Sequence, residues 1–174
     1  KKHGIDPQKD INLVQNIDFA NTSGAFVGGT GDYTVEFEPS ATLIEEEGAG
    51  YVVASVGTES GYVPYTAYST TKEFLAKNKE LLQSFTKAIE KGQKYVEEHT
   101  AAEVAKVIAP QFKETDEKTI EKIIDRYAQQ DSYKTNTYFE EDSFTLIQDI
   151  LEEAGELSQR VPYEELVTTE FSTR

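Results

Sequence analysis

The predicted fold depends on one stretch, Tyr33-Thr34-Val35-Glu36-Phe37-Glu38-Pro39-Ser40. Its first residues alternate β-branched and aromatic side chains with others, which predicts a strand. Proline is tolerated in a first helical turn, so we expect a helix to begin at Pro39 or Ser40. Ligands of α/β proteins bind where strands end, which makes Glu36 and Glu38, on one face of the strand, candidate binding residues. The alternative interpretation is a solvated strand end with two surface carboxylates.

Composition excludes several classes of function. The chain has 174 residues and a net charge of −15, which disfavours nucleic acid or an anionic membrane surface as partner. It contains no cysteine, so disulfides, thiolate metal sites and cysteine nucleophiles are excluded; this fits an extracytoplasmic bacterial protein. The two histidines are too few for a histidine-rich metal site. No membrane-spanning segment and no signal peptide is visible.

The first residues predict that the chain is a piece of a longer protein. The sequence contains no methionine, and Lys1-Lys2-His3-Gly4 reads as the tail of a helix that glycine stops. We therefore expect a missing N-terminal half, which would carry the signal or anchor.

Strand and helix patterns alternate in the first third of the chain. Strands are predicted at 11–17, 33–37 and 51–56, with short helical segments ending near Val27 and Glu47 between them. This βαβαβ order predicts an α/β fold with a partial parallel sheet. A further short strand is expected at 65–68. The glycine-rich loop at 28–31 precedes a strand, the reverse of the nucleotide-binding order, and is interpreted as a turn.

The rest of the chain is predicted to be helical. Capping boxes are expected at Thr70 to Glu73 and Thr100 to Glu103, and caps at Asn78 and at Thr115 or Asp116. An amphipathic helix follows Asn78, and Gly155 is expected to end a helix that begins near residue 140. The predicted division is an incomplete α/β second lobe at 1–62, a hinge or crossover at 63–70, and a helical segment at 71–174 that belongs to or packs on the first lobe.

Four segments, taken in order, resemble the nitrate, sulfonate, taurine and thiamine-pyrimidine (NMT1/THI5-like) solute-binding proteins. They are Lys2-His3-Gly4-Ile5-Asp6-Pro7, Gly31-Asp32-Tyr33-Thr34-Val35-Glu36-Phe37-Glu38-Pro39-Ser40-Ala41, Gly48-Ala49-Gly50-Tyr51-Val52-Val53 and Thr71-Lys72-Glu73-Phe74-Leu75-Ala76-Lys77-Asn78-Lys79-Glu80. The second is similar to the family's "G-x-V-D-A-A-V-x-W-E-P" segment, with Phe37 where tryptophan is common. The resemblance covers roughly residues 1–130, and Glu36 departs from it by standing where the family usually has an apolar residue.

The resemblance implies a type II periplasmic-binding fold, in which two lobes close on a solute and the loaded protein docks on an ABC transporter permease. The protein would be extracytoplasmic, in the periplasm or lipid-anchored on the outer face of the membrane, and would need no cofactor. The ligand would contact Phe37 and Glu38 and the helix start at Thr22 and Ser23. Three further residues are candidate ligand contacts: Glu36, Tyr62 and Tyr65.

The residues favour a pyrimidine-like or amino-bearing solute. An aromatic face can stack on a planar ligand, and a carboxylate can pair with a protonated heterocycle. Sulfonates, taurine and nitrate stay open, although two acidic neighbours would repel anions.

Three alternatives lie outside this interpretation. An acidic interaction module could use the clusters at 45–47 and 140–142, and a pyrimidine-synthesis-type enzyme is disfavoured because no triad, nucleophile elbow or metal motif is present. A homodimer of this chain, formed by sheet or segment exchange, is also open.

Overall fold

The computed structural model describes residues 3–174 and divides them into two compact units. Unit 1 covers Lys1–Val53 and unit 2 covers Ala54–Arg174, and each is described by itself. The helix tail expected at Lys1 and Lys2 lies outside the described residues. The predicted lobe boundaries at 1–62, 63–70 and 71–174 concern a larger protein and stay a prediction.

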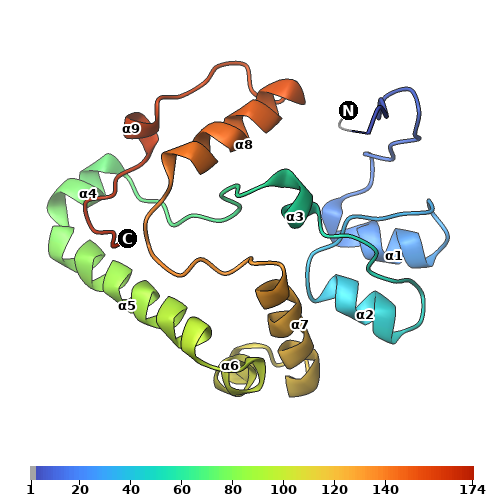
Figure 1. The fold of residues 1–174 in the computed structure, drawn as a ribbon, viewed down its shortest axis with the longest axis horizontal. Helices are drawn as coiled ribbons and strands as arrows, with labels where there is room; N and C mark the ends of the chain where they lie inside the picture. Colours follow the sequence, from blue (N-terminus) through green and yellow to red (C-terminus); the bar gives the residue numbers. More distant parts are fainter. Residues whose placement is uncertain (1–2) are drawn as a thin grey trace. The chain divides into compact units, whose positions relative to one another are not determined.

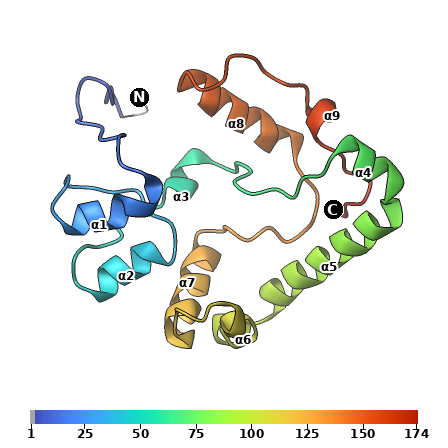
Figure 2. The ribbon, with the colours of Figure 1, turned by 180° about the vertical axis from the view of Figure 1, so that it is seen from behind.

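Helices are the only regular elements in the described part of the chain (Figures 1 and 2). Unit 1 holds η1 (Phe19–Asn21), α1 (Thr22–Val27) and α2 (Ser40–Glu46). Unit 2 holds α3 (Val56–Ser60), α4 (Lys72–Lys77), α5 (Lys79–Glu98), α6 (Ala101–Ile108), η2 (Ala109–Gln111), α7 (Glu117–Gln129), α8 (Glu141–Glu153) and α9 (Tyr163–Leu166).

The predicted α/β fold with a parallel sheet is wrong, because residues 3–174 contain no strand. The segments 11–17, 33–37, 51–55 and 65–68 have no regular structure, and residue 56 begins the helix α3. A strand exists only when its backbone amides and carbonyls pair with a neighbouring strand. Outside the helices, the backbone hydrogen bonds of the described residues join positions close in sequence, so these segments do not pair with one another. Their side chains are correspondingly exposed, as with Tyr33 at 82% and Tyr51 at 84%.

Unit 1 is built on the contact between α1 and α2, which lie side by side in blue and cyan in Figure 1. Thr42 is fully buried and Ile44 is 7% exposed, so the inner face of α2 supplies the buried residues of this unit. Gly50 follows α2 and closes the contact, since a Cβ there would lie 2.9 Å from both Ile44 Cγ2 and Phe26 Cε1.

Both helices of unit 1 end in the same way, through a glycine with positive φ. After α2, the amide of Gly48 (φ 69°) donates to Glu45 and that of Ala49 donates to Ile44. This is a Schellman motif, which pairs carbonyls that the helix end would leave unsatisfied. The helix predicted from Ser40 to about Glu47 with a glycine stop is therefore confirmed.

The core of unit 2 lies between α6 and α7. Four residues are buried there, namely Val104, Ala105, Ile120 and Ile124, with exposed fractions of 5% or less. Partly buried side chains surround this cluster, including Tyr95 and Val96 from the end of α5. The residues that meet between α6 and α7 are apolar positions at helical spacing along each helix.

Side chains cap the helices of unit 2 largely as the sequence predicted. Thr100 and Glu103 form the complete capping box of α6, and these hydrogen bonds from Thr100 lower the pKa of Glu103. Asp116 caps α7, and the hydroxyl and amide of Thr119 that bond to its carboxylate lower its pKa.

Two caps differ from the prediction. The cap of α4 is Thr71, whose hydroxyl oxygen accepts the amide of Phe74, and not Thr70. Asn78 precedes α5 as predicted, but its side chain donates to the carbonyl of Phe74 at the end of α4.

The last third of unit 2 is held by polar contacts of α8. Gln148 is 9% exposed and its amide group both accepts from and donates to the backbone of Val161. Arg160 reaches the carboxylates of Asp149 and Glu152 on the same helix, at 2.5 and 2.6 Å. Gly155 (φ 78°) ends the helix as predicted.

We expect Gly50→Ala to destabilise unit 1 by about 1–3 kcal/mol, because its Cβ would overpack against Ile44 and Phe26. The control is Gly24→Ala in α1, where no atom lies within 4 Å of the added carbon. Gly24→Ala should raise the free energy of unfolding by up to about 1 kcal/mol, because alanine has a higher helix propensity than glycine. Urea unfolding followed by far-UV circular dichroism measures the free energy of unfolding of both variants. Changes of the same sign would contradict the close packing of Gly50 against Ile44 and Phe26.

The core of unit 2 is tested by one substitution at two positions of α6. Val104 is 3% exposed and Val107 is 58% exposed. Val104→Ala removes two buried methyl groups and should lower the free energy of unfolding by about 2 kcal/mol. Val107→Ala should change the free energy of unfolding by no more than about 0.5 kcal/mol. Chemical denaturation checks the difference, and equal losses would show that the α6–α7 cluster is not the core.

Candidate functional site

Glu38 lies at the entry to α2, and its carboxylate serves the first turn of that helix. Its Oε2 atom accepts the amide of Thr42 at 3.0 Å. An anionic acceptor is favourable at a helix start, where backbone amides have no helical partner and the helix dipole is positive. Glu36 is oriented by its own contact, because its Oε1 atom accepts the hydroxyl of Thr34 at 2.8 Å. Both carboxylates are half-buried and held by named partners.

Phe37 stands between these carboxylates in sequence and packs on η1. The ring centroids of Phe37 and Phe19 are 4.9 Å apart, with planes inclined at 55°. Phe37 keeps 41% of its surface exposed, so part of an aromatic face stays accessible.

Phe19, which packs on Phe37, also contacts the start of α1. The hydroxyl of Thr22 donates to the Phe19 carbonyl at 2.8 Å, and the amide of Thr22 donates to the same oxygen. The amide of Thr22 is therefore already hydrogen-bonded, and the contact of this helix start with a ligand stays a prediction. Ser23 follows it and is half-buried. The structure thus links Phe37 and Thr22 through Phe19, a residue that the sequence reasoning did not select because no motif marks it.

Tyr62 and Tyr65, the remaining candidate residues, belong to unit 2. Both are about three-quarters exposed. The hydroxyl of Tyr62 donates a short hydrogen bond to the carboxylate of Asp131, and this bond raises the pKa of Tyr62 above its ordinary value.

Asp131 occupies an unusual backbone position for a residue with a side chain. It follows α7 with φ 53°, and its amide donates to Ala128 while that of Ser132 donates to Tyr127. This is the Schellman arrangement, in which glycine is usual and aspartate is tolerated. The sequence reasoning missed Asp131, since a helix-terminal aspartate carries little signal by itself.

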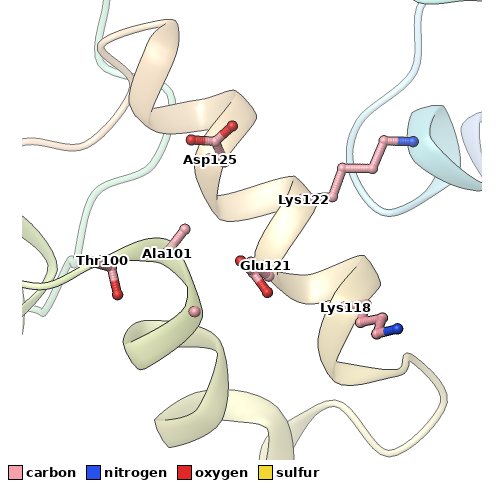
Figure 3. Close-up of a pocket in the computed structure, with 7 residues that line it drawn as sticks. Thr100, Ala101, Lys118, Glu121, Lys122 and Asp125 are labelled. Carbon is pink, nitrogen blue, oxygen red and sulfur yellow. The ribbon is translucent and has the colours of Figure 1, made fainter.

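A separate open groove of about 490 Å³ lies between the start of α6 and α7 (Figure 3). Glu121 and Asp125 of α7 face the first turn of α6 at Thr100 and Ala101, while Lys118 and Lys122 extend from the other side of α7. The groove contains none of the candidate ligand-binding residues that the sequence predicted. Charges of both signs line it.

Residues 3–174 lack two other kinds of functional feature. No group of three or more histidine or acidic side chains within them is placed to hold a metal ion. No helix among them has the length and apolar character needed to span a bilayer.

Comparison with known proteins assigns a family. The NMT1-like family matches residues 1–109. A curated protein of Bacillus subtilis (strain 168), named "Putative binding protein YtlA", is 46% identical over 173 residues. The match covers 99% of this chain and 52% of that protein, so the chain spans about half the length of its relative. No solved structure matches the chain significantly.

We expect Asp131→Asn to lower the pKa of Tyr62 toward the ordinary value of 10.0, because the anionic acceptor that favours the protonated phenol is lost. Ultraviolet titration of the tyrosines, with Tyr62→Phe subtracted, measures this pKa. Since the folded-state pKa is raised, the contact stabilises the fold below about pH 10 and loses this effect as pH rises through the folded pKa. An unchanged Tyr62 titration in Asp131→Asn would show that the carboxylate is not the cause.

Proposed function

This chain belongs to the NMT1-like family, and from that premise we propose that it is part of the extracytoplasmic solute-binding component of an ABC importer. The relative carries the name of a binding protein, which supports a binding role rather than catalysis. In this proposal the protein captures a small solute outside the cytoplasm, in the periplasm or tethered by a lipid anchor, and delivers it to a permease.

The solute we favour is an amino-bearing or pyrimidine-like heteroaromatic compound. The observation that carries this choice is the pairing of an accessible Phe37 face with the oriented carboxylates of Glu36 and Glu38. A planar ring can stack on the phenyl group, and a protonated amine can donate charge-assisted hydrogen bonds to a carboxylate. A net charge of −15 further favours a cationic or neutral solute over sulfonates, taurine or nitrate.

The proposed site centres on residues 36–38 together with Thr22 and Ser23. Tyr62 and Tyr65 belong to unit 2 and are proposed separately as aromatic contacts for a solute. When a ligand binds, the hydroxyl of Tyr62 would either retain its hydrogen bond to Asp131 or replace it with a hydrogen bond to the ligand. The carboxylate of Glu38 has a structural partner in Thr42, so a test of binding at Glu38 must separate loss of charge from loss of the helix contact.

Glu38→Gln makes this separation, because the amide oxygen can still accept from Thr42 while the negative charge is gone. We expect this change to weaken binding of an amino-pyrimidine about 10- to 100-fold, the value of a hydrogen bond to a charged group. The melting temperature without ligand should change little. The matched control is Glu47→Gln, at the other end of α2, which should leave affinity unchanged.

The assay is a thermal-shift panel followed by calorimetry on ligand-free protein, with thiamine-pathway pyrimidines, taurine, aliphatic sulfonates, nitrate and small amines. A ligand at a hundred times its dissociation constant stabilises by about 2.7 kcal/mol, which shifts the melting temperature by a few degrees. A sulfonate or nitrate hit would retain the binding role and reject our solute. A panel in which no compound binds would count against the importer proposal itself.

A further inference from the structure

Phe19 and Phe37 form an exposed pair of aromatic rings in unit 1, which we call the aromatic pair. Their centroids are 4.9 Å apart and their planes are inclined at 55°. Phe19 is 55% exposed and Phe37 is 41% exposed, so their mutual contact covers neither ring. The short helix η1, which carries Phe19, buries none of its residues. The exposure of Phe19 is therefore not explained by a role in the core of the unit.

The spacing of the aromatic pair decides where a solute can bind. A ring sandwiched between two others needs about 7 Å between their centroids, twice the van der Waals contact distance. At 4.9 Å the pair is closed to such insertion, so a solute would rest across the outer surface of both rings. An aromatic face attracts a positive charge within about 6 Å of its centroid. Because the two centroids lie closer together than this, one cation can interact with both rings.

Glu36 supplies a carboxylate beside this surface. It precedes Phe37 in the chain, and adjacent Cα atoms are about 3.8 Å apart. The Oε1 atom of Glu36 accepts the hydroxyl of Thr34 at 2.8 Å, and its other oxygen has no partner within the described part of the chain. Glu38 differs, because its Oε2 atom accepts the amide of Thr42 and its charge faces the positive start of α2. Glu36 is thus held in place by Thr34 while one of its oxygens can still receive a cationic solute.

The stretch of sequence that contains these residues has no basic side chain. From Asp10 to Thr71 there is no lysine, arginine or histidine, although acidic residues occur throughout this range. Lys9, which immediately precedes the stretch, is paired with Asp6 at 2.7 Å. The stretch therefore creates a negative potential around the aromatic pair, which attracts cations and repels anions.

We propose that Phe19, Phe37 and Glu36 bind an organic cation, whose positive charge lies over the aromatic pair and forms an ion pair with Glu36. This inference rests on the proposed function and narrows its solute from cationic or neutral compounds to cations. Phe19 and Glu36 then determine specificity, because Phe19 supplies the second aromatic face and Glu36 supplies the compensating charge.

Three probes of one shape and different charge test the preference for a cation, namely benzamidinium, benzamide and benzoate. Calorimetry on the full chain should show that benzamidinium binds at least about 10-fold more tightly than benzamide and that benzoate does not bind. In the unchanged protein, raising the salt concentration from about 0.05 to about 0.5 M should weaken binding of benzamidinium and leave binding of benzamide unaltered. This measurement needs no variant.

Glu36→Gln tests the charge, because its amide oxygen can still accept the hydroxyl of Thr34. The change should weaken binding of benzamidinium about 10-fold and alter binding of benzamide by less than about 2-fold. The control is Asp32→Asn, which removes an equal charge four residues earlier and should weaken binding of benzamidinium by less than about 3-fold. Equal losses in the two variants would assign the preference to diffuse charge and overturn the role of Glu36.

Phe19→Leu tests the second aromatic face, because leucine is apolar but has no ring. We expect binding of benzamidinium to weaken about 5-fold and binding of benzamide to weaken less, since the cation loses its attraction to the ring as well. Phe19→Tyr should restore the affinity to within about 2-fold, which a mere loss of packing area in Phe19→Leu would not require. The control is Phe112→Leu in unit 2, where a ring that is 50% exposed should have no effect.

Three results would overturn the inference: tighter binding of benzoate than of benzamidinium, equal binding of benzamidinium and benzamide, or no binding of benzamidinium. The broader solute panel then tests the proposed function separately. A sulfonate, nitrate or neutral solute found in that panel would retain the binding role and reject only the cation. The absence of any solute in that panel would remove both.

Discussion

The contact between α6 and α7 is the interaction on which unit 2 depends. Ala105 has no exposed surface there, and Val104, Ile120 and Ile124 enclose it. The first turns of both helices are fixed by their own caps, Thr100 with Glu103 on one side and Asp116 on the other. Because the helix starts are set locally, the two apolar faces meet in one register, and the end of α5 attaches to the cluster that results.

Most of the helices could be predicted because their determinants are local, although α3 begins within the strand predicted at 51–56. Apolar spacing of three and four residues, threonine and aspartate caps, and glycine stops all act within one or two turns, and the structure follows them with shifts of one residue, as from Thr70 to Thr71. The predicted sheet was wrong because strand pairing cannot be judged on the same local basis. Alternation in residues 33–37 describes which side chains would share a face, but a strand also requires a neighbouring strand that pairs with its backbone, and the described residues supply none.

The candidate site shows the same division between local and distant information. The sequence was sufficient to single out Glu38 and Pro39 at a helix start, and the contact from Glu38 to Thr42 spans only four residues. The packing of Phe37 on Phe19 and the bond from Tyr62 to Asp131, 69 residues away, are tertiary contacts between positions that no motif connects. The position of Glu38 at a helix start was therefore predictable, whereas the distant contacts of Phe37 and Tyr62 were not.

Asp131 meets two demands that usually fall on different residues. Its backbone reverses the chain after α7, for which glycine is the least strained choice, while its carboxylate anchors a tyrosine from a distant segment. Glycine would satisfy only the first demand, and a larger acid would satisfy the second with greater backbone strain. Helix termination and the tethering of the 61–70 segment are consequently coupled at one position, so any change that retunes one of them also alters the other.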